Sequence, residues 1–205
     1  MARYLGPRLR IVRRLGNLPG LTAKIPMKNT PPGQHGRKKK KPQKPLPYKI
    51  RLFEKQKLRY NYGVTERQLQ RYVREARRKK GPTAFFLMQL LEMRLDTIIF
   101  RLGLAPTIPA ARQFVNHDHI LINNKKINIP SFQCQPNDII TVQNKKGAKE
   151  LVQKSLAIPR FSTLPNHLKF DIKTMQGEIK DLVDKEDLSF KVNEFLIVEY
   201  YSNIG

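Results

Sequence analysis

The residues able to act as acids, bases or nucleophiles gather in one short stretch of the chain. They are His117, Asp118, His119, Cys134 and Asp138. Catalysis by such groups needs a base that is held by its own orienting partner, and no spacing among these residues suggests that arrangement. The sequence also lacks the glycine-rich phosphate loops of nucleotide-binding enzymes. We therefore predict that the protein is not an enzyme.

Three arginines near this stretch could instead bind phosphate. A guanidinium presents a planar fork of N–H donors that holds two oxygens at once, and Arg94, Arg101 and Arg112 supply such forks. In the alternative, local role, the first two pair with acids of their own helix at the surface, where each ion pair contributes less than about 1 kcal/mol. Those acids are Glu92 and Asp96. We expect a mixture, in which Asp96 orients an arginine that still reaches a phosphate.

Polar side chains that could add hydrogen bonds to such a ligand follow in the sequence. Amide and imidazole groups can reach a phosphate, a sugar hydroxyl or a base edge. Thr107 predicts an N-cap, in which its hydroxyl accepts from the first free amides of a helix. The polar candidates at the end of that helix are Gln113, Asn116, His117 and His119.

Two helical patterns position the arginines. Residues 91–103 form one apolar stripe that leaves Arg94 and Arg101 outside it. The second pattern, after Thr107, turns Phe114 inward and Arg112 away from the core. Both arginine-bearing faces are therefore expected at the surface.

Short β-branched runs after these helices predict strands. Residues 120–122, 126–129 and 139–142 are separated by turn residues and predict a small antiparallel sheet. Residues 168–172 and 177–179 are also typical of strands. With helices in the first half, the sequence predicts an α+β fold: a basic helical N-terminal domain followed by a small helix-pair and antiparallel-sheet module.

Positive charge is concentrated near the start of the chain. The 205 residues carry 40 Lys and Arg against 16 Asp and Glu, a formal net charge of +24. Residues 1–80 hold 25 of these cations and 3 acids, whereas residues 161–205 hold 5 cations and 8 acids. Such a balance points to a polyanionic partner. We expect the N-terminal half to face nucleic acid and the C-terminal end to face elsewhere.

The basic half contains two predicted helices. Residues 48–61 carry cations on their outer faces, and Thr65 with Gln68 forms a capping-box signature for the next helix. Four cations in a row precede Gly81. Each cation near a helix C-terminus stabilises the helix by only about a few tenths of a kcal/mol, so local stabilisation alone does not explain a run of four. The phosphate-binding candidates on these helices are Lys55, Lys57, Arg59, Arg77, Arg78, Lys79 and Lys80.

Residues 29–47 predict a disordered-prone loop. Prolines and glycines interrupt this segment, and the run that starts at Arg37 repels itself. We expect it to become ordered only against phosphate. The alternative is a solvated basic linker.

Short motifs occur in a fixed order along nearly the whole chain. They include Arg3-Tyr4-x-Gly6-Pro7, Arg13-Arg14-x-Gly16, Pro32-Gly33-Gln34-His35-Gly36, Glu54-Lys55-Gln56-Lys57, Glu92-x-Arg94-Leu95-Asp96, Arg101-x-Gly103, Ala111-Arg112-Gln113, Asn116-His117-x-His119-Ile120 and Pro136-Asn137-Asp138. This sequence resembles the family of small-subunit ribosomal protein S four. The resemblance adds Arg3, Tyr4, Arg13, Arg14, Gln34 and His35 to the expected RNA contacts.

The resemblance implies three parts and a function. These parts are a basic helical ribosomal-RNA-binding domain at 1–91, an RNA-binding module with a strand-rich extension at 92–191, and a C-terminal segment at 192–205 that packs back on the first domain. The implied protein is structural. It binds a multi-helix junction of small-subunit ribosomal RNA beside proteins S five and S three, supports subunit assembly and decoding accuracy, and is not a homo-oligomer.

The resemblance also bears on location and cofactors. The start of the chain aligns with the mature start of the family and is similar to plastid versions, so we expect no leader and a plastid stromal ribosome, with a bacterial cytoplasm as the alternative. Some members bind zinc through N-terminal cysteines, but the only cysteine here is Cys134. We expect no metal and no cofactor. No apolar run is long enough to span a membrane.

Two other functions use similar modules. One is an RNA-modifying or tRNA-charging enzyme, which needs a separate catalytic domain that the rest of this chain is too short to supply. The other is a free RNA-binding regulator of translation. Co-sedimentation with small subunits, rather than with free messenger, separates a regulator from a ribosomal protein.

Overall fold

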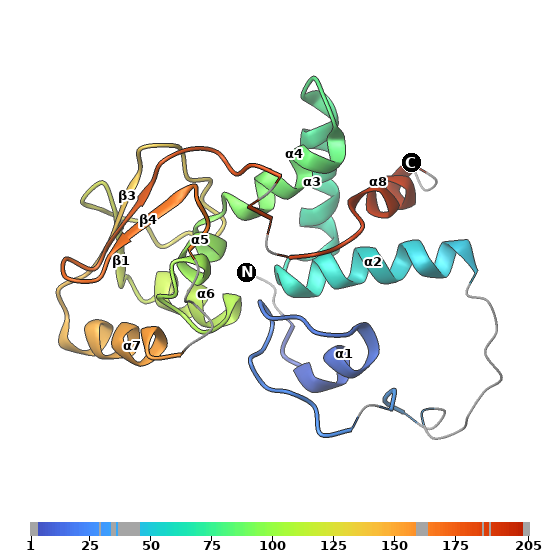
Figure 1. Ribbon diagram of the computed structural model, residues 1–205, viewed down its shortest axis with the longest axis horizontal. Coiled ribbons are helices and arrows are strands. Elements are labelled where there is room, and N and C mark those ends of the chain that lie inside the picture. Colours follow the sequence, from blue (N-terminus) through green and yellow to red (C-terminus); the bar gives the residue numbers. More distant parts are fainter. Residues whose placement is uncertain are drawn as a thin grey trace. The chain divides into compact units, whose positions relative to one another are not determined.

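The structure is a computed structural model that describes residues 4–28, 30–33, 36, 46–158, 164–185, 187–188 and 190–202. These residues form eight helices and one five-stranded antiparallel sheet, which confirms the α+β prediction. The chain divides into a first unit, residues 1–87 with 192–205, and a middle unit, residues 88–191 (Figure 1).

The first unit is helical. Its helices are α1 (Arg8–Leu15), α2 (Pro47–Asn61), α3 (Glu66–Arg78) and α8 (Glu194–Ser202), and α4 (Thr83–Glu92) runs on into the middle unit. The last helix packs against α2 and α3, as Figure 1 shows. The beginning and the end of the chain therefore share one unit.

Helix α3 begins at the predicted capping box. The Thr65 hydroxyl accepts from the Gln68 backbone N–H at 3.4 Å, and the Gln68 side chain accepts from the Thr65 N–H at 3.3 Å. The helical period after this box predicts an inward stripe that includes Leu69, Val73 and Ala76, and all three are buried. The opposite face is left to solvent.

The middle unit combines three further helices with the sheet. The helices are α5 (Leu95–Arg101), α6 (Ile108–Asn116) and α7 (Lys146–Leu156), and the strands are β1 (Ile120–Ile122), β2 (Lys125–Lys126), β3 (Ile139–Val142), β4 (Leu168–Asp171) and β5 (Gln176–Ile179). The strand order is β2-β1-β3-β5-β4, with every neighbouring pair antiparallel.

The single helix predicted over 91–103 is wrong, because the chain breaks it between α4 and α5. Arg94 forms an isolated antiparallel bridge with Gln133. Leu95 N–H donates to the Phe132 carbonyl, and Cys134 N–H donates to the Met93 carbonyl, both at 2.9 Å. These long-range bonds satisfy backbone groups that a continuous helix would have used.

Two other predicted boundaries need correction. The strand predicted at 126–129 is only the two residues of β2, because the chain then leaves the sheet for the backbone of α5, where Pro130 and Phe132 carbonyls accept from the first amides. The sequence also predicts a basic loop at Lys145, Lys146 and Lys149 and a short helix over 151–158, but α7 already begins at Lys146. The hairpin between β1 and β2 has positive φ at Asn123 and Asn124, as a type I′ turn requires.

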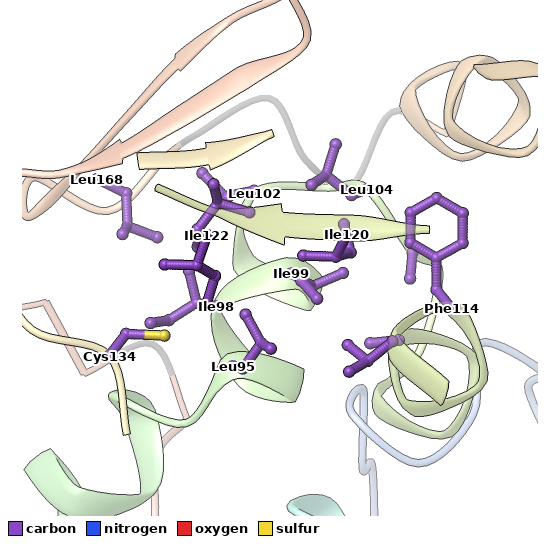
Figure 2. Close-up of a cluster of buried hydrophobic side chains, with 14 of the residues drawn as sticks. Leu95, Ile98, Ile99, Leu102, Leu104, Phe114, Ile120, Ile122, Cys134 and Leu168 are labelled. Carbon is purple, nitrogen blue, oxygen red and sulfur yellow. The ribbon is translucent and has the colours of Figure 1, made fainter. Parts of the chain in front are cut away.

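Apolar side chains from all three helices and the sheet form the core of the middle unit. Figure 2 shows Leu95, Ile98 and Ile99 of α5 lying against Ile120 and Ile122 of β1. All five are at most 3% exposed. This core fixes the two helices on which the candidate recognition residues lie.

Candidate nucleic-acid interface

A buried charged cluster joins α5 and α6. Arg94 donates to both carboxylate oxygens of Asp96, from Nε to Oδ1 at 3.0 Å and from Nη2 to Oδ2 at 2.8 Å. Arg112 donates from Nε to the same Oδ2 at 2.7 Å. Exposed fractions are 0% for Arg94 and Asp96 and 7% for Arg112. We call these three residues the arginine–aspartate cluster.

The expectation that Arg94 and Arg112 point outward is therefore wrong. The alternative role, in which these arginines form local ion pairs, is present, but the pairs lie inside the module and not at the surface. A buried carboxylate that accepts from two guanidinium groups makes their burial tolerable, whereas any one of the three charges alone would carry a large desolvation cost. Fully buried Arg94 and Asp96 cannot contact RNA in this conformation, so their role is to hold α5 against α6.

Arg101 lies closer to the surface than the cluster. Its guanidinium donates to both oxygens of Glu92, at 2.9 Å and 2.5 Å. The side chain of Arg101 is 12% exposed and that of Glu92 is 2% exposed. The pair links the end of α4 to the end of α5, nine residues apart. An RNA contact by Arg101 stays a prediction.

Lys55 also differs from the expectation. It was placed on an outer face of α2, but it is 4% exposed. Its ammonium donates to Glu66 at 2.9 Å and lies 4.7 Å from the centre of the Tyr200 ring. These two partners inside the first unit explain the burial of the charge. Lys55 therefore joins α2 to α3 and α8 and is not placed for phosphate.

Other candidates on α1 and α2 keep part of their surface. Arg14 is exposed, and Tyr4 is 41% exposed. Arg13 donates to the Thr30 carbonyl at 2.9 Å, and Lys57 pairs with Glu54 at 2.6 Å. Arg59, which is half-buried, lies 4.5 Å over the Tyr60 ring. The predicted residues Arg3, Gln34, His35 and Arg37 lie outside the described residues.

The outer face of α3 is strongly cationic. Arg77, Arg78, Lys79 and Lys80 are exposed, as their proposed role requires. The structure adds three exposed arginines that we did not predict as contacts. Four arginines lie at i, i+4, i+7 and i+11, opposite the buried stripe, and form what we call the α3 arginine row: Arg67, Arg71, Arg74 and Arg78.

The spacing of the row was visible in the sequence. The four arginines recur with the same helical period as the buried apolar positions of α3, and the period places them on the opposite face. Successive members of the row are about 4.5 to 6 Å apart along the helix axis. That separation suits neighbouring phosphates of one RNA strand.

Polar candidates at the end of α6 remain available at the surface. Gln113, Asn116 and His117 are exposed. His119 is half-buried and its ring centre lies 5.0 Å from that of Phe114. Its pKa is lowered, first by burial and then by the nearby His117 and Lys145, so the ring is neutral at neutral pH.

Thr107 acts as the predicted N-cap of α6. Its hydroxyl accepts from the Ala110 N–H at 3.3 Å, and the residue is 8% exposed. The hydroxyl is therefore engaged within the module. Its positioning of α6 is observed, whereas a direct RNA contact is a prediction.

The single Cys134 has no cysteine partner in the sequence, which predicts a buried apolar role, and the structure buries it. It is 4% exposed, and burial raises the pKa of its thiol well above the usual range. Among the described residues, no three His, Cys, Asp or Glu side chains come together in a way that could hold a metal ion. No helix in this part of the chain is both long and apolar enough for a membrane span.

Comparisons with known proteins identify the family to which the sequence belongs. Residues 3–92 match the family model described as Ribosomal protein S4/S9 N-terminal domain, and residues 93–140 match the S4 domain. The chain is 57% identical to small ribosomal subunit protein uS4 of Thermosynechococcus vestitus over 202 residues, 98% of each chain. It is 57% identical to uS4c of Cyanophora paradoxa, over 98% of this chain and 100% of the relative, and 54% identical to uS4c of Rhodomonas salina over all of both chains. The resemblance noted in the sequence is confirmed, and the chain belongs to the ribosomal protein S4 family.

Proposed function

We propose that the protein is a structural constituent of the small ribosomal subunit that binds small-subunit ribosomal RNA and catalyses no reaction. The proposal is supported by family membership over the full chain and by two exposed surfaces. One is the α3 arginine row with Lys79 and Lys80, and the other is the polar end of α6. Both are rigid helix faces built on packed cores.

The α3 arginine row carries the proposal. Four guanidinium groups on one solvent-exposed helix face have no structural explanation in the packing of the first unit, since the opposite face of α3 makes the core contacts. The mutual repulsion of such a row destabilises the free protein, and a polyanion removes it. Closely packed RNA phosphates are the partner that this spacing fits.

We infer the finer features of this role from the family resemblance. They are binding at a multi-helix junction, support of assembly and decoding accuracy, small-subunit proteins S five and S three as neighbours, and the absence of homo-oligomers. The more acidic C-terminal part, residues 161–205, is the candidate surface for protein neighbours. Relatives with uS4c names and cyanobacterial relatives support a plastid stromal ribosome, with a bacterial cytoplasm as the alternative.

Salt-dependent binding tests the proposal. The full chain is titrated against full-length small-subunit ribosomal RNA over a series of salt concentrations. A variant with the four row arginines changed to Gln should bind more weakly, and its log–log salt slope should fall by roughly 0.7 to 0.9 for each lost phosphate contact. A matched control changes Lys169, Lys173, Lys180 and Lys185 of the middle unit, all exposed, to Gln.

The control removes the same net charge from the part of the chain that we do not assign to RNA. Equal effects of the two variants would mean that the row binds only as bulk charge. A flat salt response of the unmodified protein, or co-sedimentation with free messenger rather than small subunits, would contradict the ribosomal assignment.

A further inference from the structure

A pocket of about 400 Å³ opens between α6, the loop at Leu104–Pro106 and α7. This volume is in the range of sites that bind a small ligand. The S4-domain match ends at residue 140, before α7 begins, so one wall of the pocket lies outside the matched module. None of the three residues of the arginine–aspartate cluster lines this pocket.

The pocket has apolar walls and a polar rim. Leu104, Ala105 and Phe114 contribute buried apolar surface, and Figure 2 shows Phe114 at the end of the core away from Leu168 and Cys134. Gln113, His117 and Lys154 are exposed and bring an amide, an imidazole and an ammonium group to the lining. Among the described residues of the lining, none is acidic.

Three rings offer stacking surfaces beside this rim. The Phe114 and His119 ring centres are 5.0 Å apart, and those of His117 and His119 are 5.9 Å apart. His119 Nδ1 is buried without a hydrogen-bond partner among the described residues. Buried polar atoms nearly always have a hydrogen-bond partner in folded proteins. A ligand that binds nearby would supply one for this nitrogen.

The combination fits a nucleobase better than an apolar protein side chain. A base needs flat apolar contacts for its faces and hydrogen-bonding groups for its edge, and its phosphate needs a cation within reach. Phe114 and the imidazoles supply the flat contacts, Gln113 supplies hydrogen-bonding groups for the edge, and Lys154 supplies the cation. An apolar side chain would desolvate the polar rim without replacing its hydrogen bonds.

We propose that this pocket receives one unpaired base of the RNA bound by the module, with Gln113 at its edge and Lys154 at its phosphate. The proposal rests on the proposed function and names a single-base subsite within it. The small side chains of Ala105 and Ala110 leave the space that the base fills.

A pocket-filling variant tests the subsite. Ala110→Leu extends an α6 side chain into the pocket and leaves every charge in place. Ala157→Leu is the matched control, since Ala157 is exposed at the end of α7 and does not line the pocket. Both full-length variants are titrated against full-length small-subunit ribosomal RNA, and ultraviolet crosslinks are mapped to residues and nucleotides.

The unmodified protein should give a crosslink between one unpaired nucleotide and Phe114 or His117. Ala110→Leu should lose it and bind on the order of tenfold more weakly, because stacking of a base on an aromatic ring changes affinity by about that factor. Ala157→Leu should match the unmodified protein. If Ala110→Leu does not give the normal circular dichroism spectrum, Lys154→Ala and Gln113→Ala take its place.

Several outcomes overturn the subsite and leave the proposed function intact. One is an Ala110→Leu protein with normal affinity and crosslinks, while the α3 arginine row variant binds weakly. Another is a pocket crosslink to a neighbouring protein in assembled subunits, which would indicate an apolar protein side chain. If the unmodified protein itself fails to bind the RNA, the proposed function fails as well.

Discussion

At the scale of single residues, charge serves two separate purposes in this protein. Arg94, Asp96 and Arg112 are buried and connect two helices, whereas the arginines of the α3 row are exposed. Residue type alone does not distinguish these purposes. Burial and the presence of a carboxylate within hydrogen-bonding distance do, because a guanidinium loses its water only where another group replaces it.

Replacement of the central acid should destabilise the middle unit. Asp96→Asn leaves two buried guanidinium groups without their carboxylate, and we expect the free energy of unfolding to fall by about 3 to 5 kcal/mol. Urea unfolding followed by circular dichroism measures this change. Asp184→Asn, at an exposed position, is the control and should be near neutral. An equally small effect at Asp96 would show that the cluster contributes little to the fold.

A buried histidine should make stability depend on pH. His167 is 4% exposed, its Nδ1 lies 3.5 Å from an Asp187 carboxylate oxygen, and its pKa is lowered chiefly because burial disfavours the charged form, against the opposing effect of Asp187. Below the unfolded pKa of about 6.5, the unfolded chain binds a proton that the folded chain does not. The free energy of unfolding should therefore decrease as pH falls from about 7 towards the folded pKa.

His167→Gln should remove this part of the pH dependence. Urea midpoints at several pH values provide the measurement, and His117→Gln, at an exposed position, should retain it. A slope that is the same in all three proteins would assign the effect to other groups.

At the scale of elements, local patterns predicted what local interactions determine. The capping box of α3, the N-cap of α6 and the strands β1 and β3 follow from neighbouring residues, and the structure has them where they were expected. The break before α5 follows from bonds to residues 130–134, some 40 positions away. No periodicity within 91–103 contains that information.

The same reasoning explains the errors in the candidate site. Arg94, Arg112 and Lys55 were expected outside because isolated charges favour water. Their carboxylate partners are Asp96 and Glu66, but only the folded chain shows that the pairs with Asp96 are enclosed and that Lys55 is buried beside a partly exposed Glu66. The α3 arginine row, by contrast, could have been predicted from the helical period of its cations.

The capping box should contribute measurably to α3. Thr65→Ala removes the hydroxyl that accepts from Gln68 N–H, and loss of such a cap costs about 1 kcal/mol. Chemical unfolding of the full chain should reveal this loss in the first unit. Gln70→Ala, on the same helix but outside the cap, should leave stability nearly unchanged. Equal behaviour of the two variants would argue against the capping contribution.

At the scale of the whole molecule, the first unit is completed by the end of the chain. Tyr201 donates its hydroxyl to Glu66 at 2.7 Å, and the Asn193 backbone N–H donates to Glu54 at 3.2 Å. Arg51 pairs with Glu199. Contacts of α8 thus join α2 and α3, although about 130 residues separate these elements in the sequence.

Truncation after Lys191 should therefore act on one unit only. Without α8, the amide protons of α2 and α3 should exchange faster, while those of the β-sheet keep their protection. Hydrogen–deuterium exchange with mass spectrometry compares the truncated and full chains. Faster exchange spread evenly over both units would show that the two fold as one cooperative block.

The return of α8 to the first unit also orders events during synthesis. The middle unit is one continuous segment, so all of its residues are translated before the last helix. The first unit starts earlier but stays incomplete until its final helix has been translated. The half of the protein richest in positive charge is thus the last to become complete, and nascent chains should expose its unfinished helices for most of their time on the ribosome that makes them.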